Sequence, residues 1–134
     1  MTTRKKILIV EDNRDCRELQ ACFIERLGYE VFEADTGVAA IEKALTTQPD
    51  LILMDLAMPK MDGEEAMRQL KAHPATRHIP IIVCTAFAAG SHIDEALSAG
   101  AAGILHKPFK FADLDGLFRK YMPDKQKYMA MGVE

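Results

Sequence analysis

Leu51-Ile52-Leu53-Met54-Asp55 is the stretch of sequence that decides the fold, because four consecutive apolar side chains end there in a carboxylic acid. A continuous apolar run of this length is typical of a strand whose two faces are both buried. Residues 7–10 and 81–84 are runs of the same kind. Strands buried on both faces occur in parallel sheets that helices cover on each side. The three runs therefore predict the centre of a parallel α/β sheet.

Two weaker runs and five helical patterns extend this prediction along the chain. Residues 30–34 carry Glu30 and Glu33, which favours a strand at the sheet edge, and residues 104–105 form a short last strand. Apolar residues three and four apart predict the helices between the runs. The residues that mark them are Cys16, Leu19, Phe23 and Leu27, then Ala40, Ile41 and Ala44, then Ala66, Met67 and Leu70, then Ile93, Ala96 and Leu97, and finally Phe111, Leu114, Leu117, Phe118 and Tyr121. Five such βα repeats with short connections imply right-handed crossovers and a five-stranded parallel sheet with helices on both faces.

Glycine, proline and capping residues mark the expected helix ends. Gly28 and Gly100 follow the first and fourth helices as terminators. Asp35 or Thr36 caps the start of the second helix. Pro123 stops the fifth helix, because proline cannot continue the hydrogen-bond ladder.

The composition fits one globular domain. The chain has 134 residues, of which 49% are hydrophobic and 28% are charged, as is ordinary for a soluble protein. Its net charge of −3 gives no support for nucleic-acid binding, which usually shows as a basic face. We expect one domain over residues 1–123 and a C-terminal tail over 124–134, where no periodic pattern is present.

The cysteines and the N-terminus indicate a cytoplasmic protein. Cys16, Cys22 and Cys84 are odd in number and lack CxxC spacing, so we interpret them as buried small hydrophobes in a reducing compartment. The first apolar run stops at Glu11 and is too short for a signal peptide or a membrane span.

Polar side chains follow the ends of four predicted strands. In an open parallel sheet, ligands bind outside the carboxyl ends of the strands. Glu11 and Asp12 follow the first strand, Asp55 closes the third, Thr85 closes the fourth, and Lys107 follows the fifth. We therefore expect three carboxylates, a hydroxyl and an ammonium group to meet at one edge of the sheet.

Three carboxylates at one edge predict a divalent cation. Like charges that converge without a counter-ion repel one another, and a cation relieves this. Ligands that are oxygen only, with no His or Cys, suit Mg²⁺ or Mn²⁺. The alternative is structural, with Asp12 or Asn13 only capping the first helix and Glu11 in solvent.

Asp55 has two possible roles at this edge. It can be a metal ligand only, or a nucleophile that attacks phosphorus and forms an acyl phosphate. Phosphoryl transfer needs cations around the equatorial oxygens. The metal and Lys107 can supply that charge, and Thr85 can donate a hydrogen bond to a phosphoryl oxygen.

Four segments resemble the receiver domain of two-component response regulators, in particular single-domain, chemotaxis-regulator-like ones. They are ILIVEDN (7–13), DLILMDLAMPKMDG (50–63), IPIIVCTA (79–86) and AGAAGILHKPF (99–109). The resemblance covers about residues 4–122. It implies a flavodoxin-like, three-layer (βα)5 sandwich with strand order 2-1-3-4-5, which is the order of the chemotaxis regulator used as the standard example of this fold.

The resemblance also implies a role for each residue at the edge. Asp55 is similar to the phospho-acceptor, Asp12 to the direct metal ligand, and Glu11 to a ligand that acts through water. The backbone carbonyl of Ala57 completes the protein share of the Mg²⁺ shell. Thr85 is similar to the switch hydroxyl and Lys107 to the ammonium before a cis bond to Pro108.

The implied function is a bacterial phosphorelay switch and not a turnover enzyme. A sensor histidine kinase or a histidine phosphotransfer protein donates the phosphoryl group from its phosphohistidine, and binding to an unidentified protein target then changes. No nucleic acid or membrane is involved. Such partners usually dock on the exposed part of the first helix, which we place at Arg14, Arg17, Glu18, Gln20 and Ala21.

Ile104 departs from the family pattern, which often has Tyr or Phe at this position. An aliphatic, β-branched side chain has fewer rotamers and no hydroxyl, so the usual coupling between Thr85 and a ring does not apply. Phe87 is an aromatic near the same edge that either gates the acyl phosphate or simply packs.

Three rival functions share part of this residue pattern. A Mg²⁺-dependent aspartyl phosphatase needs a second acid two residues after the nucleophile, where this chain has Ala57. A pseudo-receiver that binds partners without phosphorylation is disfavoured by the intact set of edge residues. A flavin module needs a Ser, Thr or Gly-rich phosphate loop, whereas the acidic residues 11–15 would repel a phosphate.

Overall fold

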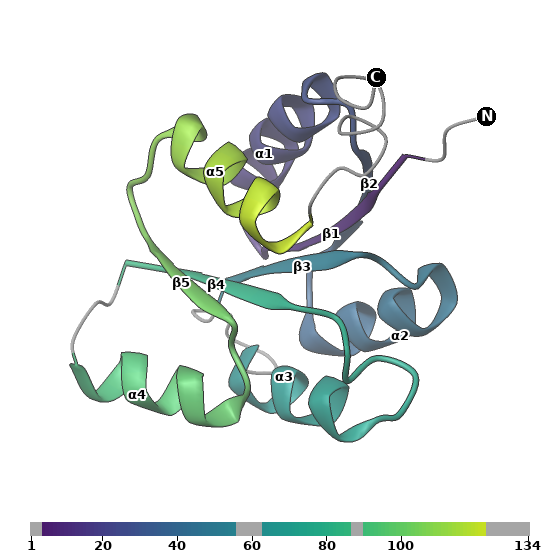
Figure 1. The fold of residues 1–134 in the computed structure, drawn as a ribbon, viewed down its shortest axis with the longest axis vertical. Helices are drawn as coiled ribbons and strands as arrows, with labels where there is room; N and C mark the ends of the chain where they lie inside the picture. The colour runs from purple at the N-terminus through teal and green to yellow at the C-terminus, as the bar shows by residue number, and fades with distance from the viewer. Residues whose placement is uncertain (1–3, 56–62, 87–89, 123–134) are drawn as a thin grey trace, which may run out of the picture.

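Strands and helices alternate in a computed structural model that describes residues 4–55, 63–86 and 90–122 (Figure 1). The predicted roles of Ala57 and Phe87 and the predicted tail, 124–134, lie outside these residues. The elements are β1 (Lys6–Val10), α1 (Arg14–Arg26), β2 (Glu30–Ala34), α2 (Gly37–Thr47), β3 (Leu51–Asp55), α3 (Gly63–Ala72), β4 (Ile81–Thr85), α4 (Gly90–Ala99), β5 (Gly103–His106) and α5 (Phe111–Tyr121).

The five described strands form one parallel sheet in the order β2-β1-β3-β4-β5. Figure 1 shows α1 and α5 on one face of the sheet, with α2, α3 and α4 on the other. The predicted three-layer sandwich and its flavodoxin-like strand order are confirmed. The strand with two glutamates, β2, lies at the edge as expected.

The pleat of the central strands builds a core on each face of the sheet. Every residue of β3 and β4 is buried, as the continuous apolar runs predicted. Successive side chains point to opposite faces. Ile7 and Ile9 therefore pack towards Leu114 and Phe118 of α5, and Leu8 and Val10 pack towards Met67 and Leu70 of α3.

Caps and glycines end the helices close to the predicted places. The Asn13 side chain accepts from the Cys16 N–H at 2.9 Å, and Thr36 accepts from the Ala39 N–H at 3.0 Å, so Thr36 caps α2. Gly28 and Gly100 have φ values of +102° and +117°, in the left-handed region that favours glycine.

Two expectations for α1 are wrong. Cys16 and Cys22 are exposed, and only Cys84 among the three cysteines is buried. Leu19, which the apolar spacing assigned to the core, is 61% exposed.

The reason is that the face of α1 towards the sheet is offset by one residue from the predicted stripe. Gln20, Ala21 and Ile24 are buried there, and Arg17 lies one turn before them. Because Arg17 and Gln20 on this face are polar, apolar spacing in the sequence does not identify it as the buried face. Gln20 and Ala21 are therefore not part of an exposed docking surface, and the expectation that Arg17 is exposed there is also wrong, because its side chain is only 17% exposed.

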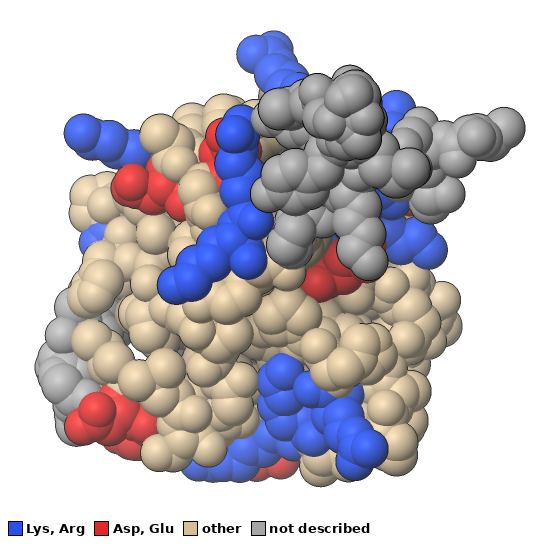
Figure 2. All heavy atoms as spheres, viewed as in Figure 1, with Lys and Arg blue, Asp and Glu red and all other residues tan. Residues whose placement is uncertain are grey.

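Charged side chains of both signs share the surface. On the face drawn in Figure 2, Lys and Arg lie in separate groups with uncharged surface between them, and Asp and Glu lie among them. In this view Lys and Arg cover more of the described surface than Asp and Glu.

None of the helices in the described ranges has the length and apolar character needed to cross a membrane.

Three glycine-to-alanine variants test the local backbone geometry. Gly116 in α5 has open space around it, so Gly116→Ala should raise the free energy of unfolding by about 0.5–1 kcal/mol. Gly28→Ala meets no neighbour but strains a positive φ, which costs about 1–2 kcal/mol. Gly100→Ala should cost more, because a Cβ there would lie 2.7 Å from Cγ of Lys71.

Urea titration measures all three differences. Equal losses for Gly28→Ala and Gly100→Ala would contradict the close approach of Lys71.

Candidate active site

The carboxyl edge of the sheet collects the residues that the strand ends predicted. Because the strands are parallel, their carboxyl ends meet at one edge. Val10 of β1 pairs with Met54 of β3, and Asp55 pairs with Cys84 of β4. This register places Glu11 and Asp12, which follow β1, beside Asp55.

Lys107 joins two of these carboxylates. Its Nζ donates to Oε1 of Glu11 at 2.8 Å and to Oδ2 of Asp55 at 3.1 Å. The Lys107 side chain is 25% exposed, whereas those of Glu11 and Asp55 are only 4% and 8% exposed. Buried carboxylates need such a partner, because removing an isolated charge from water is costly. The ammonium group therefore holds together residues that lie far apart in the sequence.

The donor set of this edge fits a hard divalent cation. Glu11, Asp12 and Asp55 each offer a carboxylate oxygen, and these oxygens lie within 4.8 Å of one another. Asp12 is exposed, while the other two residues are buried. Oxygen ligands alone favour Mg²⁺ or Mn²⁺ over Zn²⁺.

The electrostatics of the site leave Lys107 charged and make Glu11 easier to protonate. Burial raises the pKa of Glu11, and the nearby Asp55 raises it further, against the opposing effect of Lys107. Burial by itself would lower the pKa of Lys107, but its contacts with Glu11 and Asp55 outweigh this and raise it. Burial raises the pKa of the Cys84 thiol to about 12, so Cys84 stays protonated and adds no thiolate ligand.

The loop after β1 serves both the site and the helix. The Asn13 N–H donates to Oε2 of Glu11 at 3.2 Å, while the Asn13 side chain caps α1. Capping therefore belongs to Asn13 and does not account for Asp12. Glu11 is buried, so the alternative of a solvated Glu11 is wrong.

Thr85 lies on β4, the strand next to that of Asp55, and Ile104 lies on β5, one strand further out. Thr85 is buried at the end of β4, and its carbonyl accepts from the Lys107 N–H at 2.9 Å. Ile104 of β5 is partly buried and packs on the core that α3 and α4 cover. The peptide bond between Lys107 and Pro108 is cis, as the resemblance implied.

Arg17 contacts the backbone of the site, a role that the sequence patterns did not predict. Its Nη1 donates to the backbone carbonyl of Glu11 at 2.9 Å, and its Nε donates to Glu33 at 3.0 Å. The sequence indicates this role only indirectly, because Arg17 is a polar residue one helical turn before the buried Gln20 and Ala21.

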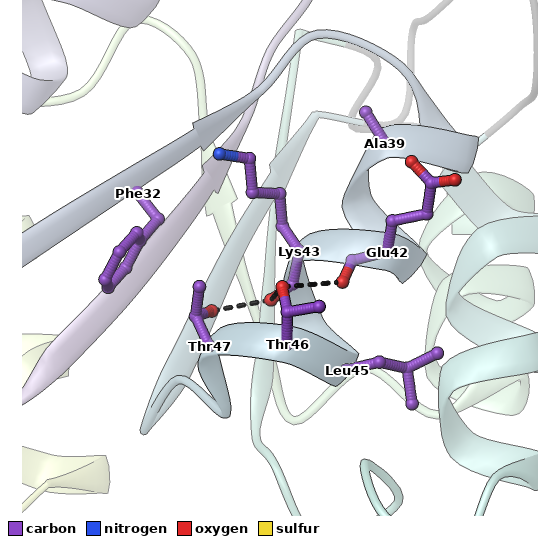
Figure 3. A pocket seen from close by; sticks show the side chains of 7 residues that line it. All are labelled: Phe32, Ala39, Glu42, Lys43, Leu45, Thr46 and Thr47. Atoms are coloured by element: carbon purple, nitrogen blue, oxygen red, sulfur yellow. Dashed lines mark hydrogen bonds between the residues drawn. The ribbon is translucent and has the colours of Figure 1, made fainter.

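A surface hollow of about 570 Å³ between β2 and α2 is separate from this site (Figure 3). None of the residues that line it belongs to the acidic group. The hydroxyls of Thr46 and Thr47 donate to helix carbonyls and are not directed at a ligand. The carboxyl edge of the sheet, and not this hollow, is therefore the candidate active site.

Comparisons with known proteins agree with this arrangement. The profile of one family, the response regulator receiver domain, matches residues 7–119. The polar-differentiation response regulator DivK of Brucella ovis is 34% identical over 120 residues, which cover 90% of this chain and 98% of that protein.

Solved structures extend the similarity to the fold. The receiver domain of the sensor histidine kinase PA1611 from Pseudomonas aeruginosa superposes with a TM-score of 0.84 at 34% identity, covering 91% of this chain and all of that domain. That domain has a magnesium ion coordinated in its active-site cleft. The chemotaxis protein CheY4 of Vibrio cholerae has a TM-score of 0.85 at 28% identity, over 90% of this chain and all of that one.

Removing the shared ammonium group should destabilise the protein. In Lys107→Met, two buried carboxylates lose their partner, so the free energy of unfolding at pH 7 without divalent cations should fall by about 1–3 kcal/mol. The exposed Lys43→Met is the matched control and should change it by less than about 0.5 kcal/mol.

The stability lost in Lys107→Met should depend on pH in one direction. Without Lys107 the pKa of Glu11 rises further above its unfolded value, so the folded variant binds more protons than the unfolded chain. The deficit should therefore shrink as the pH falls from about 7 towards 5. A deficit that is constant or grows over this range would contradict the assigned charge pairing.

Proposed function

The chain belongs to the family of response regulator receiver domains of two-component systems, and we propose that it accepts a phosphoryl group on Asp55 and thereby switches its binding to a partner protein. The observation that carries this proposal is the arrangement of Lys107. Its ammonium group contacts the buried Asp55 and Glu11, with the Asp12 carboxylate in the same group. Asp55 is thus a carboxylate surrounded by the groups that phosphoryl transfer requires.

The metal of the proposed reaction is Mg²⁺ or Mn²⁺. Asp12 and Asp55 would bind it directly, Glu11 would bind it through water, and the carbonyl of Ala57 would complete the protein ligands. Bound there, the ion would neutralise the carboxylates and hold oxygens of the incoming phosphoryl group. The close approach of three carboxylate oxygens supports this assignment.

In the proposed step, a carboxylate oxygen of Asp55 forms a bond to phosphorus. The bond from phosphorus to a histidine nitrogen of the donor breaks, and the departing imidazole takes up a proton. The donor would be a sensor histidine kinase or a histidine phosphotransfer protein. Lys107, already 3.1 Å from Asp55, would then hydrogen-bond a phosphoryl oxygen.

The proposed switch needs a difference in free energy between its two states, and the phosphoryl group would create one. The phosphoryl group adds about −1.5 to −2 charge. Reversing a 1:99 population needs roughly 5.5 kcal/mol. A charge-assisted hydrogen bond is worth about 1.5–3 kcal/mol, and bonds from Lys107 and Thr85 to the phosphoryl group would supply part of this difference, since Lys107 already contacts Asp55 before phosphorylation. Because the Lys107 N–H already donates to the Thr85 carbonyl, movement of one residue would carry the other with it.

We propose that the protein is a switch and not a turnover enzyme. An aspartyl phosphatase would need a second acid where the sequence has Ala57. The remaining alternative, a pseudo-receiver that is never phosphorylated, predicts no phosphoryl uptake at all, so labelling of the wild type by a phosphodonor separates the two.

Asp55→Asn should abolish labelling by a small phosphodonor such as acetyl phosphate in Mg²⁺, because an amide does not form the acyl phosphate. Mass spectrometry of the intact protein would show the added phosphoryl group, and hydroxylamine would remove it from the wild type. Asp94→Asn, which changes an exposed acid of α4, is the control and should be labelled normally. A hydroxylamine-labile adduct on Asp55→Asn would remove Asp55 from its assigned role, and no adduct on the wild type would favour the pseudo-receiver.

Asp12→Ala should weaken Mg²⁺ binding at least about tenfold, because it removes a direct carboxylate ligand. Isothermal titration calorimetry measures the affinity. Asp15→Ala removes an exposed acid from the first turn of α1 and controls for the loss of one negative charge nearby. Similar affinities for the two variants would show that Asp12 acts only through its charge.

A further inference from the structure

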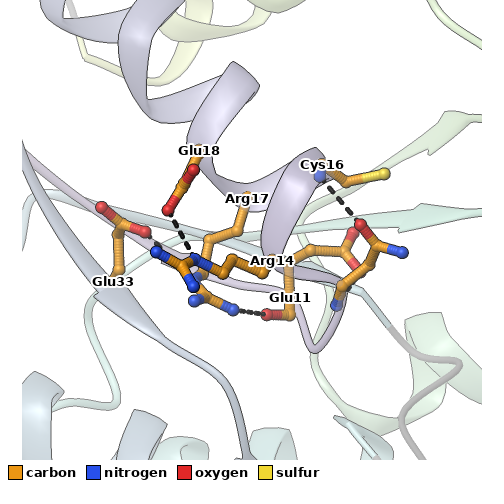
Figure 4. Close-up of polar contacts among 7 residues, drawn as sticks. Glu11, Arg14, Cys16, Arg17, Glu18 and Glu33 are labelled. Carbon is orange, nitrogen blue, oxygen red and sulfur yellow. Dashed lines mark hydrogen bonds and ion pairs between the residues drawn. The ribbon is translucent and has the colours of Figure 1, made fainter.

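Arg17 connects three parts of the structure at the edge of the proposed metal site. From the first turns of α1 it reaches the backbone carbonyl of Glu11 with Nη1 at 2.9 Å and the carboxylate of Glu33 with Nε at 3.0 Å (Figure 4). Its side chain is only 17% exposed. One guanidinium thus ties the first helix, the edge strand β2 and the loop that follows β1.

The Glu11 residue is consequently held through both of its backbone polar groups. Its N–H donates to the carbonyl of Ala34, the last residue of β2, at 3.0 Å. Its carbonyl accepts from Arg17, which Glu33 of the same strand anchors. This carbonyl belongs to the peptide unit that leads into Asp12, so its orientation determines how the Glu11 and Asp12 side chains leave the chain.

We propose that Arg17, anchored by Glu33, is a positioning residue that sets the Glu11–Asp12 peptide so that both carboxylates converge with Asp55 on one cation. This inference rests on the proposed function, because it concerns the same metal site. Arg17 itself contacts neither the cation nor the phosphoryl group. It acts through the backbone that carries two of the three carboxylates.

The chemistry of the contact requires arginine. A planar guanidinium donates in two fixed directions and can satisfy a carbonyl and a carboxylate at once, whereas a lysine ammonium is a single point of charge. The neighbouring ion pair of Arg14 and Glu18 differs in this respect. Its side chains are 79% and 54% exposed, and it joins two residues of the same helix (Figure 4). Exposed pairs of that kind contribute little, so Arg14 provides a matched control.

Two effects of Arg17 on the metal oppose each other. Its positive charge repels a cation, but Glu33 pairs with that charge. Its hydrogen bond orders the ligand loop, and residues that orient metal ligands in this way typically change affinity by 10–100-fold. We expect the ordering effect to dominate, with a loss of about tenfold when the contact is removed.

The test compares Arg17→Met, Arg17→Lys, Glu33→Gln and Arg14→Met in the whole chain. Mn²⁺ affinity, followed by electron paramagnetic resonance, should fall about tenfold in both Arg17 variants and stay unchanged in Arg14→Met. Arg17→Lys keeps the positive charge. A loss of Mn²⁺ affinity in both Arg17 variants would therefore be due to the lost two-directional contact and not to the lost charge. Glu33→Gln should lose less, and the double variant Arg17→Met with Glu33→Gln should be no weaker than Arg17→Met alone, since the two residues act as one unit.

A second readout distinguishes positioning from general destabilisation. With a small phosphodonor, the Mg²⁺ concentration for half-maximal labelling should rise about tenfold in Arg17→Met, while the rate at saturating Mg²⁺ stays within about twofold of the wild type. Unchanged or tighter Mn²⁺ binding in the Arg17 variants would overturn the inference, as would a rate that excess Mg²⁺ does not restore. If the wild type bound no Mn²⁺, the proposed function would fail and this inference with it. If the wild type binds Mn²⁺ and is labelled while Arg17→Met matches it, only the inference fails.

Discussion

One ammonium group between two buried carboxylates is the constraint on which the rest of the structure depends. Lys107 can reach Glu11 and Asp55 only when β1, β3 and β5 lie in one parallel sheet, because these residues follow or end those strands. A buried carboxylate without a partner is costly, so the fold that brings Lys107 to Glu11 and Asp55 stabilises both of these buried groups. The same pairing holds the buried Asp55 close to a cationic group that can stabilise added negative charge.

The central strands and the site residues were predictable from the sequence because both follow from the buried sheet. Runs such as 51–54 show no alternation, since both faces of the strand are covered, and parallel strands bring their carboxyl ends to one edge. The inward face of α1 was not predictable in this way. Arg17 and Gln20 occupy inward positions that are usually apolar. The apolar spacing therefore pointed to Cys16 and Leu19 as the buried residues, and both are exposed. An arginine can face inward there only because Glu11 and Glu33 supply acceptors, and those contacts join residues from separate parts of the chain.

Edge strand β2 therefore does more for the site than close the sheet. It supplies the carbonyl of Ala34 and the carboxylate of Glu33, and through them it holds the backbone of Glu11. On the opposite side of Asp55, the Thr85 carbonyl and the Lys107 N–H connect β4 to the residue after β5. Ile104 packs against the core under α3 and α4 and is not an aromatic ring that could rotate. The backbone bond between Lys107 and Thr85 is a route by which a change at Asp55 would still reach β5.

A crystal structure of the protein with Mg²⁺ and beryllofluoride, a mimic of the phosphoryl group, would show directly whether Asp55 is the acceptor. We expect beryllium bonded to a carboxylate oxygen of Asp55, the cation against Asp12 and Asp55, and Lys107 Nζ turned from Asp55 to a fluorine. Beryllofluoride on another side chain, or a saturating concentration that leaves Asp55 unmodified and still bound to Lys107, would contradict it.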